Sequence, residues 1–149
     1  MIMRICKRRL IVFFLSCVLI MNALSLGGYA SIESSDYICS GDLYLDQGST
    51  NGELELDFDI TGQGTMDTIG VSKIKVYRQD GVLYRTIYGT TANGLLANNT
   101  FSHSGLFSIS AIAGVTYCCE VTFFAGKDGG YDTTVIFSNY VVAPVVPSP

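Results

Sequence analysis

The sequence predicts an all-β fold, an antiparallel β-sandwich of about seven strands preceded by a signal peptide. First, apolar and acidic residues alternate strictly in 53–61, as in a strand with one buried and one solvated face. Second, turn-forming residues recur about every ten residues after residue 30. Third, 113–125 forms the most apolar strand of that part, which belongs at the centre of a sheet beneath a second layer.

Residues 1–30 have the pattern of a secretory signal peptide. A basic start is followed by an apolar run, and Gly28-Tyr29-Ala30 places small residues at the positions that a signal peptidase recognises. The alternative is an uncleaved anchor, but the apolar run 10–26 is marginal for a bilayer, which needs about 20 residues. A lipoprotein site at Cys17 is disfavoured because Phe14 stands at the first position of the motif, where leucine is usual.

Cleavage after Ala30 would leave one domain, large enough for a core of its own. We expect a frayed or disordered start at 31–35, the β-sandwich at 36–143 and an extended, proline-containing tail at 144–149. The mature chain would carry five Lys and Arg against thirteen Asp and Glu, a net charge of −8. This charge disfavours nucleic acid and anionic membranes as partners.

Cysteine and histidine give little support to metal or cofactor chemistry, and we expect none. The only histidine is His103, and no C-x-x-C spacing occurs. Three cysteines remain after residue 30, an odd number that leaves at least one free or intermolecular thiol. Cys39 has two potential disulfide partners, Cys119 if both point inward and Cys118 otherwise, whereas Cys119 could instead be a small buried residue.

The first half of the chain predicts four strands. The first, 37–45, places Tyr37, Cys39, Leu43 and Leu45 on one face, and 53–61 follows a polar turn. The outward carboxylates of 53–61 repel one another, so neighbouring strands should offer Ser, Thr or solvent there. A cation site is disfavoured, because carboxylates two residues apart on a strand do not converge. A Gly-rich connection at 61–70 then leads to the strand 71–78.

An Asp-Gly turn at 79–81 predicts a hairpin between 71–78 and a fourth, edge strand at 82–88. A long link at 89–105 should follow, with His103 as a loop residue that lacks the neighbours needed for catalysis. Further strands are predicted at 106–112, with Phe107, Ile109 and Ala111 inward, and at 133–142, after a flexible loop at 126–132.

Residues 112–117, followed by Cys119, Val121 and Phe123, resemble the sixth strand of immunoglobulin-like and fibronectin type III domains. The resemblance implies a tyrosine corner, in which the Tyr117 hydroxyl bonds backbone near the end of the preceding strand. The chain departs from the pattern in having no Trp, the residue that usually fills the centre of such cores.

The whole mature chain also resembles a family of small secreted bacterial proteins of unknown function. The resemblance rests on 61–70, 73–77, Asn98 with His103-Ser104, and 114–123. It implies an exported protein of a Gram-positive bacterium, and it implies no activity.

These patterns lead to a functional hypothesis without a catalytic centre. Ten side chains are predicted to form the core: Leu54, Leu56, Phe58, Ile60, Ile74, Val76, Tyr117, Cys119, Val121 and Phe123. Tyrosines of edge strands and loops are the candidate binding surface: Tyr77, Tyr84, Tyr88, Tyr131 and, less centrally, Tyr140. We expect a secreted or cell-surface, non-enzymatic module that binds a protein or glycan. The alternative is a structural protein that assembles through sheet edges, and a hydrolase is third.

Overall fold

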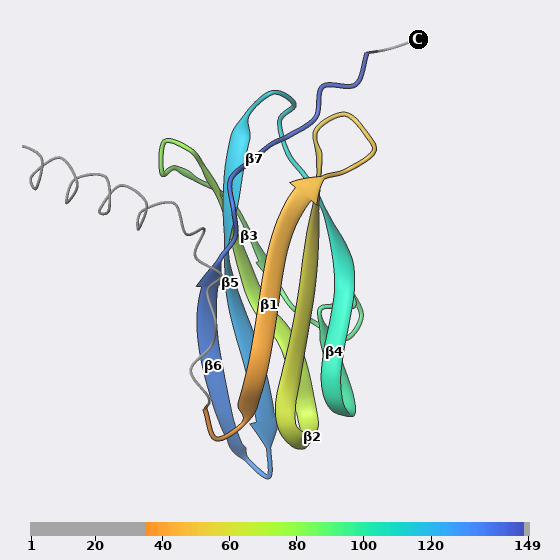
Figure 1. The fold of residues 1–149 in the computed structure, drawn as a ribbon, viewed down its shortest axis with the longest axis vertical. Coiled ribbons are helices and arrows are strands. Elements are labelled where there is room, and N and C mark those ends of the chain that lie inside the picture. Colours follow the sequence, from red (N-terminus) through yellow and green to blue (C-terminus); the bar gives the residue numbers. More distant parts are fainter. Residues whose placement is uncertain (1–34, 148–149) are drawn as a thin grey trace, which may run out of the picture.

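Seven antiparallel strands make up the regular structure in a computed structural model that describes residues 35–147 (Figure 1). The strands are β1 (Ile38–Gln47), β2 (Glu53–Arg78), β3 (Leu83–Tyr88), β4 (Leu96–Ser110), β5 (Thr116–Lys127), β6 (Gly130–Phe137) and β7 (Val141–Val142). The prediction of an all-β, antiparallel fold with about seven strands is confirmed. The predicted signal peptide lies outside the described residues.

The long strand β2 organises the fold by belonging to both halves of the sheet. Its residues 53–61 pair with β1 on one side and with 102–110 of β4 on the other. Its residues 68–78 pair with β5, and the last of them also pair with β3. The register shifts between Thr61 and Met66, and β2 turns back on itself at the lower end of Figure 1.

We call the group of β1, 53–61 of β2 and 102–110 of β4 the β1 half. The β5 half comprises β3, 68–78 of β2, β5 and β6, with β7 paired to the start of β5. The predicted connection at 61–70 is therefore wrong, since these residues continue β2. Gly64, with a φ of 115°, is found at the reversal, where a side chain would be strained.

One hydrophobic core fills the space between the two halves. Alternation along each strand sends every second side chain inward, so β2 supplies apolar residues from both of its halves. The ten side chains predicted for the core are at most 2 % exposed: Leu54, Leu56, Phe58, Ile60, Ile74, Val76, Tyr117, Cys119, Val121 and Phe123. Met66 and Ile69 of β2 are buried as well.

Strand β4 crosses between the halves in the same way as β2. Residues 96–100 pair with the second half of β2, and 102–110 pair with its first half. Asn99, with a φ of 54°, lies just before the crossing. The predicted long link at 89–105 is consequently wrong, because only 89–95 remain outside the strands.

The start of β1 contains a register shift that the sequence pattern did not reveal. Between Ile38 and Ser40 one extra residue, Cys39, is inserted opposite β2. Ile38 is buried and Cys39 is exposed, so the predicted inward face of Tyr37, Cys39, Leu43 and Leu45 is wrong at Cys39.

The C-terminal elements also differ from the prediction. Instead of a flexible loop at 126–132, Asp128 and Gly129 form a tight turn, with φ of 52° and 81°, between extended strands β5 and β6. The predicted strand 133–142 divides into β6 and β7. The described part of the predicted tail is bonded to the 48–52 turn, since Gly52 N–H donates to the Pro144 carbonyl at 2.8 Å.

Candidate functional site

The outer face of the β5 half has an ion pair at its centre. Lys75 and Glu120 lie opposite each other on β2 and β5, and Lys75 Nζ is 2.8 Å from Glu120 Oε1. The Tyr77 hydroxyl donates to the other carboxylate oxygen at 3.3 Å. The hydrogen bond from Lys75 holds the pKa of Glu120 below its ordinary value, and Glu120 in turn raises the pKa of Lys75. Lys75 and Glu120 are therefore partners within the face.

Apolar and aromatic side chains line the β6 side of this face. Val135 and Phe137 lie opposite Thr122 and Glu120 of β5, and Tyr131 lies opposite Gly126, so all three point outward with Glu120. Tyr140 follows β6 and contacts the Cys118 thiol, which raises the pKa of its hydroxyl. We call Tyr131, Val135, Phe137 and Tyr140 the β6 strip.

Members of the β6 strip are 50–65 % exposed. Tyr131 is held in place by stacking on Phe124, with ring centroids 5.7 Å apart. The strip therefore presents large apolar surface to solvent without burying it in the core.

The five tyrosines of the predicted binding surface are not brought together, apart from Tyr131 and Tyr140 on the β6 strip. Tyr88 is 70 % exposed and points outward from β3, beside Lys73, whereas Tyr131 lies on β6 at the opposite side of the face. Tyr77 is half-buried and bound to Glu120.

The placement of Tyr84 on a binding surface is wrong. The β2–β3 register shifts so that Arg85 and Leu83 have partners and Tyr84 is the extra residue. Its ring turns inward against the core, 5.2 Å from the ring of Tyr117. Sequence reasoning missed Val135 and Phe137, although they share one parity in β6 while the buried Ile136 occupies the other.

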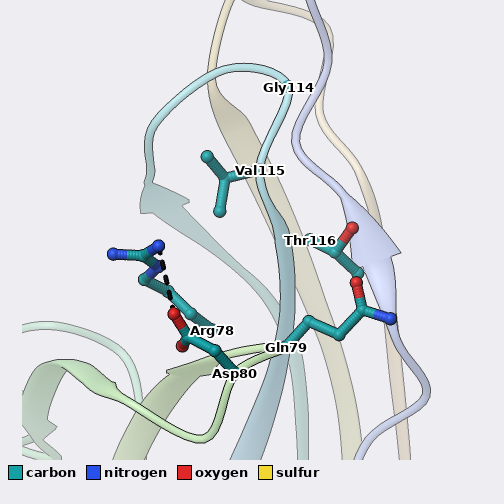
Figure 2. Close-up of a pocket in the computed structure, with 6 residues that line it drawn as sticks. All are labelled: Arg78, Gln79, Asp80, Gly114, Val115 and Thr116. Atoms are coloured by element: carbon teal, nitrogen blue, oxygen red, sulfur yellow. Dashed lines mark ion pairs between the residues drawn. The ribbon is translucent and has the colours of Figure 1, made fainter.

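An open pocket of about 470 Å³ lies at one end of the molecule, between the β2–β3 turn and the turn before β5 (Figure 2). It is lined by Arg78, Gln79, Asp80, Gly114, Val115 and Thr116. Arg78 and Asp80 are its only charged residues, and their side chains already pair at 3.1 Å. Beside this ion pair, the side chains of Gln79 and Thr116 give the pocket wall an amide and a hydroxyl that can form hydrogen bonds.

Cys119 is a small buried residue of the core, one of the two alternatives expected for it, whereas Cys39 is not as expected. The predicted disulfide between Cys39 and Cys119 is wrong, because Cys39, Cys118 and Cys119 are all free. The extra residue in β1 turns Cys39 outward, while Cys119 points into the core. Burial raises the pKa of the Cys119 thiol to about 12, so this thiol stays protonated and unreactive at neutral pH.

His103 lies within β4 rather than in the predicted loop. Its Nε2 is 2.7 Å from the Gly94 carbonyl oxygen, and its ring packs edge-on against Phe58 at 5.3 Å. The first contact connects the 89–95 loop to the β1 half, and the second holds the ring within that half, so the role of His103 is structural.

The outer face of the β1 half carries six carboxylates: Asp42 and Asp46 of β1 and Glu53, Glu55, Asp57 and Asp59 of β2. β4 offers serines beside them, as expected, but β1 places Asp42 opposite Asp59 and Asp46 opposite Glu55. The expectation of uncharged neighbours is therefore wrong for β1. Within residues 35–147, no group of three or more His, Cys, Asp or Glu side chains is arranged to hold a metal ion.

Comparison of the chain with protein-family models, curated proteins and solved structures gives no match. In the part of the chain that the structure describes, no helix has the length and apolarity to cross a membrane. Function must therefore be argued from the faces themselves.

Proposed function

We propose that this protein is a non-catalytic recognition module that binds a protein or a glycan through the outer face of the β5 half. The observation that carries the proposal is the β6 strip, in which Tyr131, Val135, Phe137 and Tyr140 are each at least half exposed. Leaving such side chains in water forgoes the stabilisation that burial would give them. Exposed aromatic and aliphatic side chains gathered on one side of a sheet are typical of binding sites.

The surroundings of the strip suit recognition rather than chemistry. The neighbouring charges, Lys75 and Glu120, are paired with each other, so the face offers directed polar contacts beside a flat apolar strip. Aromatic rings can stack on the apolar faces of sugars or fill pockets of a protein partner.

For the fold, we propose an immunoglobulin-like or fibronectin type III-like sandwich. Supporting it are three strands in the β1 half opposite four in the β5 half, and the hydrogen bond that Ile112 N–H donates to the Tyr117 hydroxyl at 3.2 Å. Tyr117 is fully buried, as a tyrosine corner requires.

We further propose that the module is exported to the cell surface or the medium by a Gram-positive bacterium. The support is the signal-like pattern of 1–30 and the resemblance to small secreted proteins. An intact mass of the secreted product that begins at Ser31 is expected, whereas a product retaining residues 1–30 would favour the anchor.

Binding is tested with a glycan array and with pull-downs from bacterial and host surfaces, using full-chain protein. We expect a specific ligand whose capture falls at least about tenfold in Tyr131→Ala/Phe137→Ala, because hot-spot aromatics contribute that much to interfaces. The matched control is Tyr44→Ala, since Tyr44 is 56 % exposed but points from the opposite face. Absence of a specific ligand, or equal loss in the control, would contradict the proposal.

A second candidate function is assembly through sheet edges, and one observation favours it. Residues 102–110 of β4 pair with β2 on one side, and no strand of residues 35–147 pairs with them on the other. Figure 1 shows β4, in cyan, at the outer edge of the β1 half. A strand of this length with a free edge can template another strand.

A further inference from the structure

We infer that two copies of this chain pair through the free edge of β4, antiparallel and in one register, with Leu106 opposite Leu106 of the second copy. The inference rests on the second candidate function and specifies its edge, symmetry and register. Four observations lead to it: which edges are covered, where charge is absent, which backbone groups are free, and how the side chains are spaced.

Among the other edge strands, β1, β3 and β6, the longest is β1, and it is already blunted by side chains. Asn139 bonds both backbone groups of Leu45, accepting from its N–H at 3.0 Å and donating to its carbonyl at 2.8 Å. Asp132 accepts the Tyr37 N–H at 3.0 Å. Such caps prevent edge-to-edge pairing, and segment 102–110 of β4 has none along most of its length.

β4 also lacks the charges that protect edge strands. No Asp, Glu, Lys or Arg occurs between Arg85 and Glu120, a stretch that contains the whole of β4. Edge strands of monomeric proteins commonly carry Lys, Pro or inward charges, so the absence of all of them in β4 makes this edge competent for pairing.

Along β4, the backbone N–H and carbonyl groups of successive residues point alternately toward β2 and toward the free edge. One hydrogen bond shows which residues point which way. Ala111 N–H donates to the Gly52 carbonyl at 2.7 Å, so odd-numbered residues of this segment point toward β2. The N–H and carbonyl groups of Ser104, Leu106 and Ser108 therefore point to the free edge. Thr100 Oγ1 already donates to the Ser102 carbonyl at 3.0 Å, which ends the free segment at that side.

The side chains are spaced symmetrically about Leu106. Serines stand two and four residues away on both sides, at 102, 104, 108 and 110. With Leu106 opposite Leu106 of the second copy, Ser104 of each copy lies opposite Ser108 of the other. These three residue pairs would exchange about six backbone hydrogen bonds. Leu106, which is 70 % exposed in the single chain, gains an apolar neighbour.

The same register places glycine opposite an aromatic ring on the inner side. Gly105 would lie across from Phe107 of the second copy, and a half-buried Phe107 can cover the backbone that glycine leaves bare. Phe58 is the only neighbour that a side chain at Gly105 would meet within 4 Å, so the space is open.

The serines also keep the two acidic faces apart. In the pair, the β2 strands of the two copies are separated by two β4 strands, a distance of about 14 Å at about 4.8 Å per strand. This exceeds the screening length of about 8 Å at physiological salt. Pairing through β1 would instead bring Asp42 and Asp46 of both copies together. Charge therefore selects the β4 edge for a second copy.

The register is tested by disulfide trapping in the Cys39→Ser background, which removes the exposed native thiol. Leu106→Cys should form a covalent dimer on mild oxidation, because directly paired residues lie about 5.5 Å apart, within disulfide reach. Ser104→Cys and Ser108→Cys should cross-link when the two variants are mixed. Neither should cross-link alone, because like positions would be about 13 Å apart.

Association itself is tested by sedimentation and native mass spectrometry of the full chain. We expect a concentration-dependent dimer that Leu106→Lys weakens at least tenfold, since two lysines would then oppose each other. Folding should survive, because the new lysine lies beside Asp57. Val135→Lys, an equivalent change on β6, should leave the dimer intact.

The outcomes separate this inference from the function on which it rests. A strict monomer up to about 1 mM, a concentration that reveals even weak pairs, would overturn both. A dimer that resists Leu106→Lys and does not trap the mixed pair would overturn the β4 register and leave assembly standing. Trapping only with an unrelated strand-forming peptide, and not with a second copy, would overturn the inference in favour of a foreign partner.

Discussion

The two outer faces of this protein are built partly from one strand yet have opposite chemistry. In its first half β2 points Glu53, Glu55, Asp57 and Asp59 outward, and in its second half it points Lys73, Lys75 and Tyr77 outward. The inward residues of the two halves are equally apolar. The inward residues, every second one along the strand, determine the fold. The outward residues between them are free to determine what each face binds.

Charge is segregated between the faces as a result. The β1 half carries six outward carboxylates and no Lys or Arg, whereas all five Lys and Arg of residues 35–147 lie in the β5 half or its turns. On the β5 half, Glu120 has Lys75 as a partner; on the β1 half, Asp42 has Asp59 opposite it. The acidic face is tolerated because water and the serines of β4 surround it, and the mixed face is suited to close contact.

The largest expected effect separates inward from outward aromatics. Phe58→Ala should lower the free energy of unfolding by about 3–5 kcal/mol, because it opens a cavity in the core. Phe137→Ala, which changes an aromatic residue 61 % exposed, should change it by less than about 0.5 kcal/mol. Denaturant titrations of both variants give the comparison. A cost for Phe137→Ala near that of a core residue would make the β6 strip structural and remove the contrast between the faces.

Tyr117→Phe should lower the free energy of unfolding by about 1 kcal/mol, because it removes the buried hydroxyl that accepts the Ile112 N–H. Tyr88→Phe is the matched control, since Tyr88 is 70 % exposed, and it should leave stability unchanged. The same denaturant titration measures both. Equal stability of Tyr117→Phe and the parent chain would show that the corner hydrogen bond contributes nothing.

The core was predictable because alternation is a local property of the sequence. Strict alternation identified Leu54, Phe58 and Ile74 as inward residues without knowledge of their partners. The tyrosine-corner bond was likewise implied by a short local resemblance. In such stretches the odd or even position of a residue along the strand is enough to decide whether its side chain is buried or exposed.

Errors arose where one residue interrupts the alternation. An extra residue at Cys39 and another at Tyr84 reverse the parity of what precedes or follows them, and no local signal marks either. The glycine-rich 61–70 was also misassigned, because pairing with two distant strands outweighs weak strand propensity. The β6 strip and the free β4 edge depend on which strands become neighbours, which is a property of topology.

A smaller effect tests repulsion on the acidic face. Asp59→Asn should raise stability by about 0.2–1 kcal/mol, since it removes one of two like charges that lie directly opposite each other. Asp57→Asn is the control, because Asp57 lies between the uncharged Tyr44 and Leu106. Thermal unfolding at low and high salt measures both, and salt should shrink the gain by screening. Equal effects of the two variants would mean that the total charge of the face matters and its pairing does not.

The smallest effect concerns the paired charge of the mixed face and its dependence on pH. Lys75 lowers the pKa of Glu120 below 4.5, so the pair's contribution is present above pH 4.5 and is lost as pH falls through the lowered value. Thermal unfolding of the parent chain and of Glu120→Gln should therefore differ by a small, constant amount near neutrality and converge in acid. The difference in thermal stability between the parent chain and Lys75→Gln should likewise disappear in acid, because this variant removes the same interaction. Both side chains are partly exposed, Lys75 by 30 % and Glu120 by 18 %, so high salt should reduce the difference. A difference that persisted far below pH 4.5 would mean that Glu120 acts through packing, and that the mixed face, like the acidic one, gains nothing from the charge it carries.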